Sequence, residues 1–168
     1  MARVVADAGG ARRWTLHLPP LEARLVAGLP AQLDRLLTHP EENKRVIERL
    51  FPPGYADAAE QAEHQRLLGA SLLESRRELL DVVRGQLAGA TADAQGLRLT
   101  LDEPGVDALL RFVNDVRLVL ATDLDIRSNL SEQTPPPGHP DAPRYSLLVY
   151  LGGLEAVLLA AITDSAPD

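Results

Sequence analysis

The sequence predicts a mainly α-helical fold with a small β element, an α+β domain of four to five packed helices with an N-terminal hairpin and one further short strand. Apolar residues recur at helical spacing over most of the chain, and strict alternation is confined to two short stretches. Hydrophobic residues make up 45% of the 168 positions but aromatic residues only 4%, so Leu, Val, Ala and Ile must build the core. We interpret residues 1–168 as a single domain, an ordinary length for one core.

The predicted β element begins in residues 1–18. Two short apolar stretches, Val4-Val5 and the alternating Trp14, Leu16 and Leu18, flank Gly9-Gly10, a pattern typical of a β-hairpin with a flexible turn. Residues 97–101 alternate Leu with Arg and Thr and are expected to form one further strand. A lone hairpin is marginal in water, so this strand is expected to join it.

Residues 19–126 are expected to form a helical body. Pro19-Pro20 opens a first helix, which continues through Leu36 and contains Pro30, a residue that predicts a kink or a break. Acidic residues at the start and arginines near the end indicate a shorter helix over 41–50. A long helix is predicted over about 57–87, and Asp102 is a good N-cap for a helix that ends near residue 124.

The chain ends in a proline-rich segment and an apolar helix. Residues 127–144 hold five prolines and are expected to form an exposed, mobile loop. The helix predicted over 145–164 has a single charge, Glu155, between Tyr145 and Ile162, and that stretch is just long enough to span a bilayer. A buried or interface helix, outside any membrane, is favoured instead by Gly152-Gly153, the central Glu155 and the acidic flanks. Such a helix could also form a homodimer.

The residue inventory argues against an enzyme. The chain has no Cys, which excludes disulfides, thiolate metal sites and Cys nucleophiles. Glu60 and His64 share a helical face and could supply two metal ligands, but such pairs are more often solvated. Asp123-Leu-Asp125 begins like a calcium loop, but Ser128 stands where that loop needs Gly. No phosphate loop or nucleophile motif occurs, so we expect no catalytic residue, cofactor or metal.

Charge and the N-terminal sequence bear on partners and location. The formal net charge is −7, and residues 101–168 hold eleven acidic residues against four arginines. An acidic surface repels phosphate backbones, so direct binding of nucleic acid is disfavoured. No long apolar stretch follows the N-terminus as in an export signal, and a cytoplasmic location is expected.

Arg76 is the most unusual charged residue of the pattern, because it falls in the middle of the apolar sector of the helix over 57–87. An Arg among core residues must be paired or must reach water. The helix after Asp102 offers Asn114 and Asp115, and we group Arg76, Asn114, Asp115 and Arg117 as a structural polar network. A buried ion pair between the helices is the favoured interpretation, and a ligand site is the alternative.

Two motifs resemble a known family. Leu50-Phe51-Pro52-Pro53-Gly-Tyr55, followed by the helix that contains Arg76, and residues 112–118 resemble an uncharacterised actinobacterial family, the domain of unknown function number twenty-seventeen. The resemblance runs from the N-terminal hairpin to the last helix, and these are packing motifs without chemistry. The family includes the actinobacterial oxidative-stress regulator, which implies thiol sensing and contact with an alternative sigma factor. Without Cys, thiol sensing does not carry over, whereas sigma-factor contact does remain compatible with the residues.

We therefore expect a non-enzymatic regulator that acts by protein–protein contact, in transcription regulation of the oxidative-stress type through a sigma factor or RNA polymerase. Two alternatives stay open. One is an accessory protein of the Clp proteolytic system, since members of the family are commonly encoded beside the adaptor of the Clp protease. The other is a small-ligand-binding domain that uses the region of Arg76 and Asp115.

Overall fold

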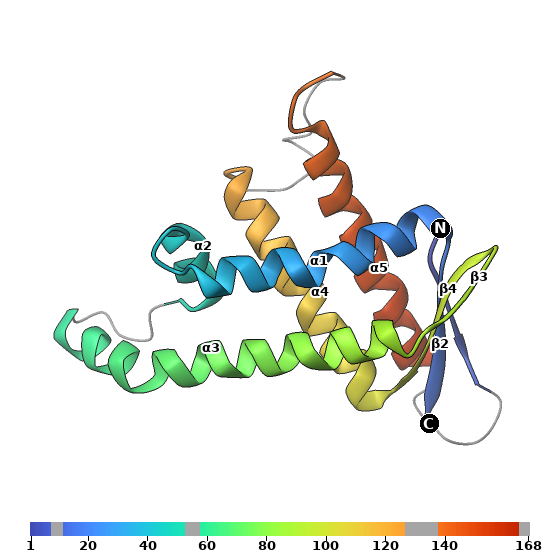
Figure 1. Ribbon diagram of the computed structural model, residues 1–168, viewed down its shortest axis with the longest axis horizontal. Helices are drawn as coiled ribbons and strands as arrows, with labels where there is room; N and C mark the ends of the chain where they lie inside the picture. The colour runs from blue at the N-terminus through green and yellow to red at the C-terminus, as the bar shows by residue number, and fades with distance from the viewer. Residues whose placement is uncertain (8–11, 53–57, 127–137, 165–168) are drawn as a thin grey trace.

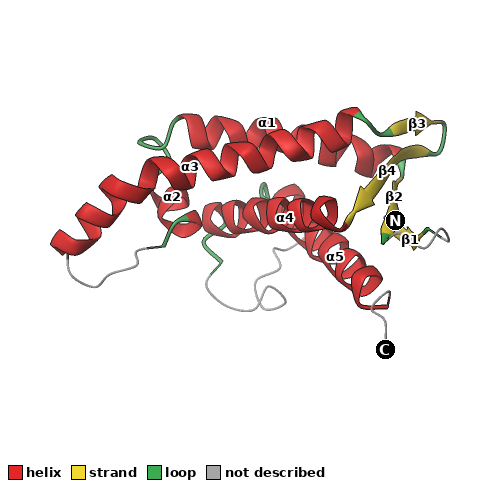
Figure 2. Ribbon diagram, turned by 90° about the horizontal axis from the view of Figure 1, so that it is seen from below, coloured by secondary structure: helices red, strands yellow, loops and turns green. Residues whose placement is uncertain are grey.

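Helices form most of the computed structural model, which describes residues 1–7, 12–52, 58–126 and 138–164, without the side chains of 58–68 and 70. Within these ranges the chain has five helices and one sheet, so the predicted mainly α fold with a small β element is confirmed. The sheet lies at one end of the helices (Figure 1). Figure 2 shows α1 and α3 in one layer and α4 and α5 in the other.

The sheet is antiparallel, in the order β1-β2-β4-β3. Its strands are β1 (Arg3–Ala6), β2 (Arg13–Leu18), β3 (Thr91–Asp93) and β4 (Gly96–Asp102). Trp14, Leu16 and Leu18 of β2 lie opposite Leu101, Leu99 and Leu97 of β4, so the alternation that predicted both strands also sets their register. The predicted joining of residues 97–101 to the hairpin is therefore confirmed. β3 was not predicted, because its three residues are all exposed and show no alternation.

Gly96 turns the chain from β3 into β4 in a conformation that only glycine adopts readily. Its φ is +128°, and a Cβ at this position would lie 2.0 Å from the carbonyl oxygen of Leu18. β2 and β4 approach so closely here that no larger residue fits.

The helices are α1 (Pro20–Thr38), α2 (Lys44–Leu50), α3 (Ala58–Ala88), α4 (Glu103–Asp123) and α5 (Ala142–Asp164). Asp102 caps α4 as predicted, because its carboxylate accepts a hydrogen bond from the Gly105 amide at 2.9 Å. The predicted break at Pro30 is wrong: α1 continues through it as one helix. The Pro30 ring is buried, so its packing offsets the hydrogen bond that proline cannot donate.

Two predicted helix starts are corrected. The second helix begins at Lys44 instead of residue 41, because the residues before it form a turn in which the Asn43 side chain donates to the carbonyl of His39 at 2.9 Å. α5 begins at Ala142, so the last three residues of the predicted loop over 127–144 belong to the helix. Pro143 fits there because the first turn of a helix tolerates proline. Residues 127–137 of that loop lie outside the described residues.

The core lies between the two layers and against the sheet. α4 is central to it, packing against α2, α3, α5 and the sheet, and its Phe112 is fully buried. Trp14 closes the sheet end, where its indole nitrogen donates to the carbonyl of Ala161 on α5 at 3.1 Å. This hydrogen bond thus links the N-terminal hairpin directly to the C-terminal helix.

α5 is apolar but only partly buried. Four leucines face the core, Leu148, Leu151, Leu154 and Leu158, whereas Val149 is 58% exposed and Leu159 is 49% exposed. By length and composition α5 could cross a membrane, and 22% of its apolar window is buried inside the protein. A single helix that passes this test is weak evidence for a membrane span, because core helices of soluble proteins also pass it.

Candidate functional site

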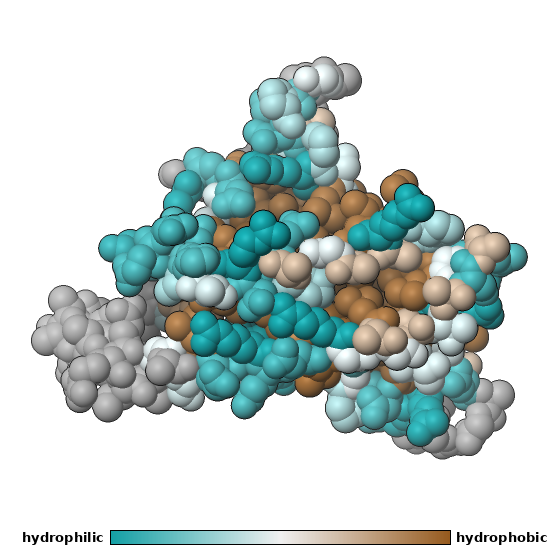
Figure 3. Space-filling view, in the orientation of Figure 1, coloured by the Kyte–Doolittle hydropathy of each residue, from teal (hydrophilic) through white to brown (hydrophobic). Residues whose placement is uncertain are grey.

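An apolar groove of about 440 Å³ opens where α4 and α5 diverge over α1. In the space-filling view it lies in the hydrophobic area between the polar surface of α1 and α2 and the upper part of α5 (Figure 3). Its apolar lining comes from three helices: Leu29, Leu33 and Leu36 of α1, Val116, Val119 and Leu120 of α4, and Leu147 of α5.

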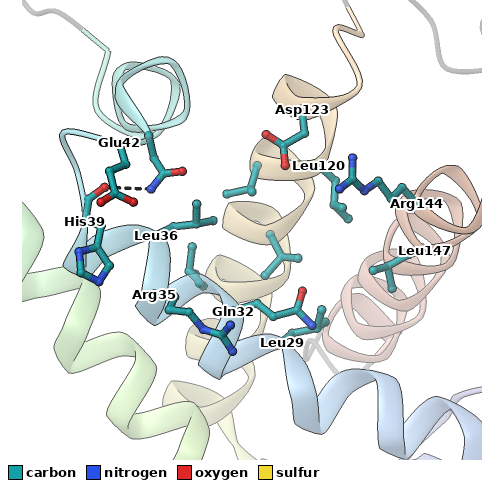
Figure 4. A pocket seen from close by; sticks show the side chains of 14 residues that line it. Leu29, Gln32, Arg35, Leu36, His39, Glu42, Leu120, Asp123, Arg144 and Leu147 are labelled. Atoms are coloured by element: carbon teal, nitrogen blue, oxygen red, sulfur yellow. Dashed lines mark hydrogen bonds between the residues drawn. The ribbon is translucent and has the colours of Figure 1, made fainter. Parts of the chain in front are cut away.

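Polar side chains surround this apolar lining (Figure 4). Both signs of charge are present, with Arg35 and Arg144 on one hand and Glu42 and Asp123 on the other. Arg144, in the first turn of α5, is paired with Asp141 just before that helix at 3.4 Å, and the Asn43 side chain donates a hydrogen bond to the carbonyl of His39. The groove therefore combines an apolar floor with a mixed, hydrogen-bonding rim, the composition of a recognition site for an amphipathic partner.

No group of three or more His, Asp or Glu residues that could hold a metal ion is found among the described residues. Glu42, Asp123 and His39 line the groove but do not form such a group. The side chains of Glu60 and His64, the pair weighed for a metal from the sequence, lie outside the described residues.

A second polar feature joins α3 to α4. Arg76 Nε lies 3.2 Å from Asp115 Oδ2, so Arg76 reaches one of the two partners favoured by the sequence. The Asp115 side chain is 3% exposed and that of Arg76 is 29% exposed. The two atoms are close but not aligned as a hydrogen bond, and neither has a hydrogen-bond partner elsewhere in the described structure. The pair is therefore a side-on ion contact and not the two-pronged arrangement that arginine makes in its strongest pairs.

Burial dominates the electrostatics of Asp115. It raises the pKa of the Asp115 carboxyl from 3.8 to about 6, although the nearby Arg76 guanidinium lowers it. Desolvation thus outweighs attraction, as expected for a carboxylate that has one poorly aligned partner. The desolvation of Asp115 therefore offsets part of the stability that its attraction to Arg76 contributes, as is common for buried ion pairs.

Arg76 also contacts the first of the two family-like motifs. Its guanidinium carbon lies 5.6 Å from the centre of the Phe51 ring, within the range of a cation–π contact. A cavity of about 280 Å³ adjoins this contact and is lined by Leu50, Phe51, Pro52, Leu72, Ser75 and Arg76. The motif and the interhelical ion pair, which the sequence places far apart, therefore meet at one place.

The remaining residues of the predicted polar network lie elsewhere. Asn114 is exposed and has no described hydrogen bond, so it takes no part in the pair of Arg76 and Asp115. Arg117 is bonded to Glu155 of α5 and belongs to a separate ion pair. Of the family-like motif, Leu50 is buried and Pro52 is exposed, whereas Pro53 and Tyr55 lie outside the described residues. Within the Asp123-Leu-Asp125 segment, Asp125 is paired with Arg45.

Sequence reasoning did not find the groove. Its leucines occupy ordinary positions of amphipathic helices, and nothing in their spacing distinguishes a leucine that lines an open groove from one that is fully covered. The available signal was that the last helix has more apolar residues than one core-facing side needs. This surplus indicated a further apolar contact surface but did not show where on the protein it lies.

Comparison with known proteins gives a family for the chain. Residues 1–162 match the family described as Domain of unknown function (DUF2017), and the chain belongs to this family. No curated protein and no solved structure matches the chain.

Proposed function

We propose that this chain is a non-enzymatic regulatory protein that binds a partner through the groove between α1, α4 and α5. The observation that carries the proposal is the groove itself, an opening with an apolar floor and a rim of both charges. A groove of this composition suits an amphipathic helix, whose apolar residues at i, i+3 or i+4 and i+7 enter the floor while its polar flanks meet the rim.

The partner that we propose is a protein of the transcription machinery, a sigma factor or a subunit of RNA polymerase, in regulation of the oxidative-stress type. This part of the proposal rests on the resemblance described in the sequence analysis. The net charge of −7 supports it, because an acidic chain meets the basic surfaces of DNA-binding proteins with favourable charge complementarity and repels DNA itself.

The test is to mix the purified chain with each sigma factor and the polymerase core of its own genome, and with promoter DNA alone. We expect one sigma factor or polymerase subunit to bind, and DNA alone not to bind. The affinity should fall as salt rises, because exposed charges are screened within about 8 Å at physiological ionic strength.

Groove variants connect this binding to the site. Leu120→Glu and Leu147→Glu place a charge on the half-buried floor, whereas Val82→Glu places the same charge on α3, away from the groove, at a valine that is 49% exposed. The two groove variants should lower the affinity about tenfold or more and Val82→Glu should not, provided that circular dichroism shows all three folded. Equal affinities for the three variants would contradict the groove, and capture of Clp components instead of transcription proteins would contradict the proposed partner.

A further inference from the structure

The cavity beside Arg76 has the features of a small-ligand site, separate from the groove. Arg76 enters it from α3, and Phe51 and Pro52 line it from the end of α2. Its volume of about 280 Å³ exceeds that of a single side chain, and its lining combines apolar carbon with one guanidinium and one hydroxyl, that of Ser75. Such a lining matches a ligand with an apolar body and one anionic end.

The guanidinium of Arg76 has unused hydrogen-bonding capacity. Nε is directed to Asp115, and the two terminal nitrogens, which carry four N–H donors, make no hydrogen bond among the described residues. Asp115 therefore occupies one side of the guanidinium and leaves its fork available. A carboxylate is the group that this fork binds best, through two parallel hydrogen bonds.

The surroundings hold Arg76 in position for such a ligand. The Phe51 ring lies under the guanidinium, and the buried Asp115 fixes its Nε edge, so that little side-chain freedom remains to be lost on binding. The cavity itself is lined by no acidic residue among the described ones. Among the described lining residues, Arg76 therefore supplies the only charged group.

We propose that the cavity formed by Phe51, Ser75 and Arg76 binds a small organic carboxylate, with its carboxylate on the Arg76 fork and its apolar body against Leu50, Pro52 and Leu72. The ligand would contact α2 and α3 at once and so stabilise their packing. This inference does not depend on the partner-binding groove, whose lining shares no residue with the cavity.

Hexanoate is a suitable probe, with hexanamide as its matched neutral control. Titration of the full chain, followed by two-dimensional NMR, should show saturable shifts at Phe51, Ser75 and Arg76 with hexanoate and an affinity for hexanamide that is lower by about tenfold or more. Equal affinities for the acid and the amide, or shifts confined to another part of the protein, would overturn the proposal.

Three variants assign the binding to the cavity. Arg76→Gln keeps a donor for Asp115 but removes the charge and the fork, so hexanoate binding should fall at least about tenfold. Leu72→Trp fills the cavity from a residue that is 39% exposed and should abolish binding without unfolding the chain. Arg77→Gln, on the exposed side of α3, should leave binding unchanged. Wild-type affinity in Leu72→Trp would contradict the site even where Arg76→Gln fails to fold.

Discussion

The guanidinium of Arg117 on α4 is bonded to the carboxylate of Glu155 on α5, across the interface of the two helices. Glu155 is the single charge between Tyr145 and Ile162. Its side chain is 23% exposed, and the guanidinium of Arg117 lies beside Gly152, 3.7 Å from where a Cβ would stand. This ion pair explains how an otherwise apolar helix holds an acid against the body of the protein.

Glu155→Ala should lower the free energy of unfolding by about 1–2 kcal/mol, because it leaves the half-buried Arg117 without its partner. Urea denaturation measures the change. Arg12→Ala, which removes the solvent-exposed pair with Glu103, serves as the control and should cost about 0.5 kcal/mol or less. A cost for Glu155→Ala no larger than for Arg12→Ala would show that the interhelical pair contributes nothing to stability.

Arg76→Ala should destabilise the protein by about 3 kcal/mol, because it leaves the buried Asp115 unpaired and removes the contact with Phe51. Arg77→Ala changes the neighbouring, exposed arginine and should stay within about 0.5 kcal/mol of the wild type. Thermal and urea unfolding of the two variants decide this. Equal melting temperatures would contradict the role given to Arg76.

Asp115 should make the protein less stable as the pH rises. Its pKa is raised from 3.8 to about 6 in the folded state, so the folded state binds the proton more tightly than the unfolded state. The protonated Asp115 carboxyl therefore adds about 3 kcal/mol to the free energy of unfolding at pH values below 3.8. This contribution is lost as the pH rises through about 6.

Asp115→Asn removes this titration. The free energy of unfolding of the variant, minus that of the wild type, should therefore be larger at pH 7 than at pH 4 by about 2 kcal/mol. The difference between the two proteins is the informative quantity, because the other carboxyl groups titrate in both. A difference that is the same at both pH values would refute the raised pKa.

The homodimer expected from the sequence would use the outer face of α5. This face carries Val149, Ala156, Leu159 and Ala160, all exposed, with Gly152 and Gly153 half-buried beside them. Light scattering at micromolar concentration should give the mass of a dimer, and Val149→Glu should give that of a monomer, because a charge at the contact opposes association. Val82→Glu on α3 is the matched control. A monomeric wild type would rule out the dimer.

Local patterns predicted the fold well where one face of an element is buried. The strands β2 and β4 were predicted correctly from the alternation of Trp14 and the leucines, whose side chains pack on the core. The patterns failed where tertiary contacts decide. Pro30 sits inside a continuous helix because its ring is buried there, and the three exposed residues of β3 are a strand because β4 offers its edge.

The candidate sites were predicted less completely. A helical wheel could place Arg76 on an apolar sector and suggest Asp115 as its partner, because both helices have regular spacing. It could not show that Phe51 lies under the same guanidinium, since the end of α2 and the middle of α3 meet through tertiary packing alone. The groove depends on the divergence of α4 and α5, which is a property of packing angles that the spacing of apolar residues does not specify.

The bond from Trp14 to the carbonyl of Ala161 has a consequence for the order of events during synthesis. It joins residues that are 147 positions apart, and the pairing of β2 with β4 must wait for residue 102. A nascent chain emerging from the ribosome therefore exposes a tryptophan and the apolar face of its first hairpin until almost all of the domain has been made. Such long-range closure slows folding relative to helical bundles of local contacts. Premature termination within α5 should consequently yield fragments that aggregate or are degraded, because the sheet end of the core stays open.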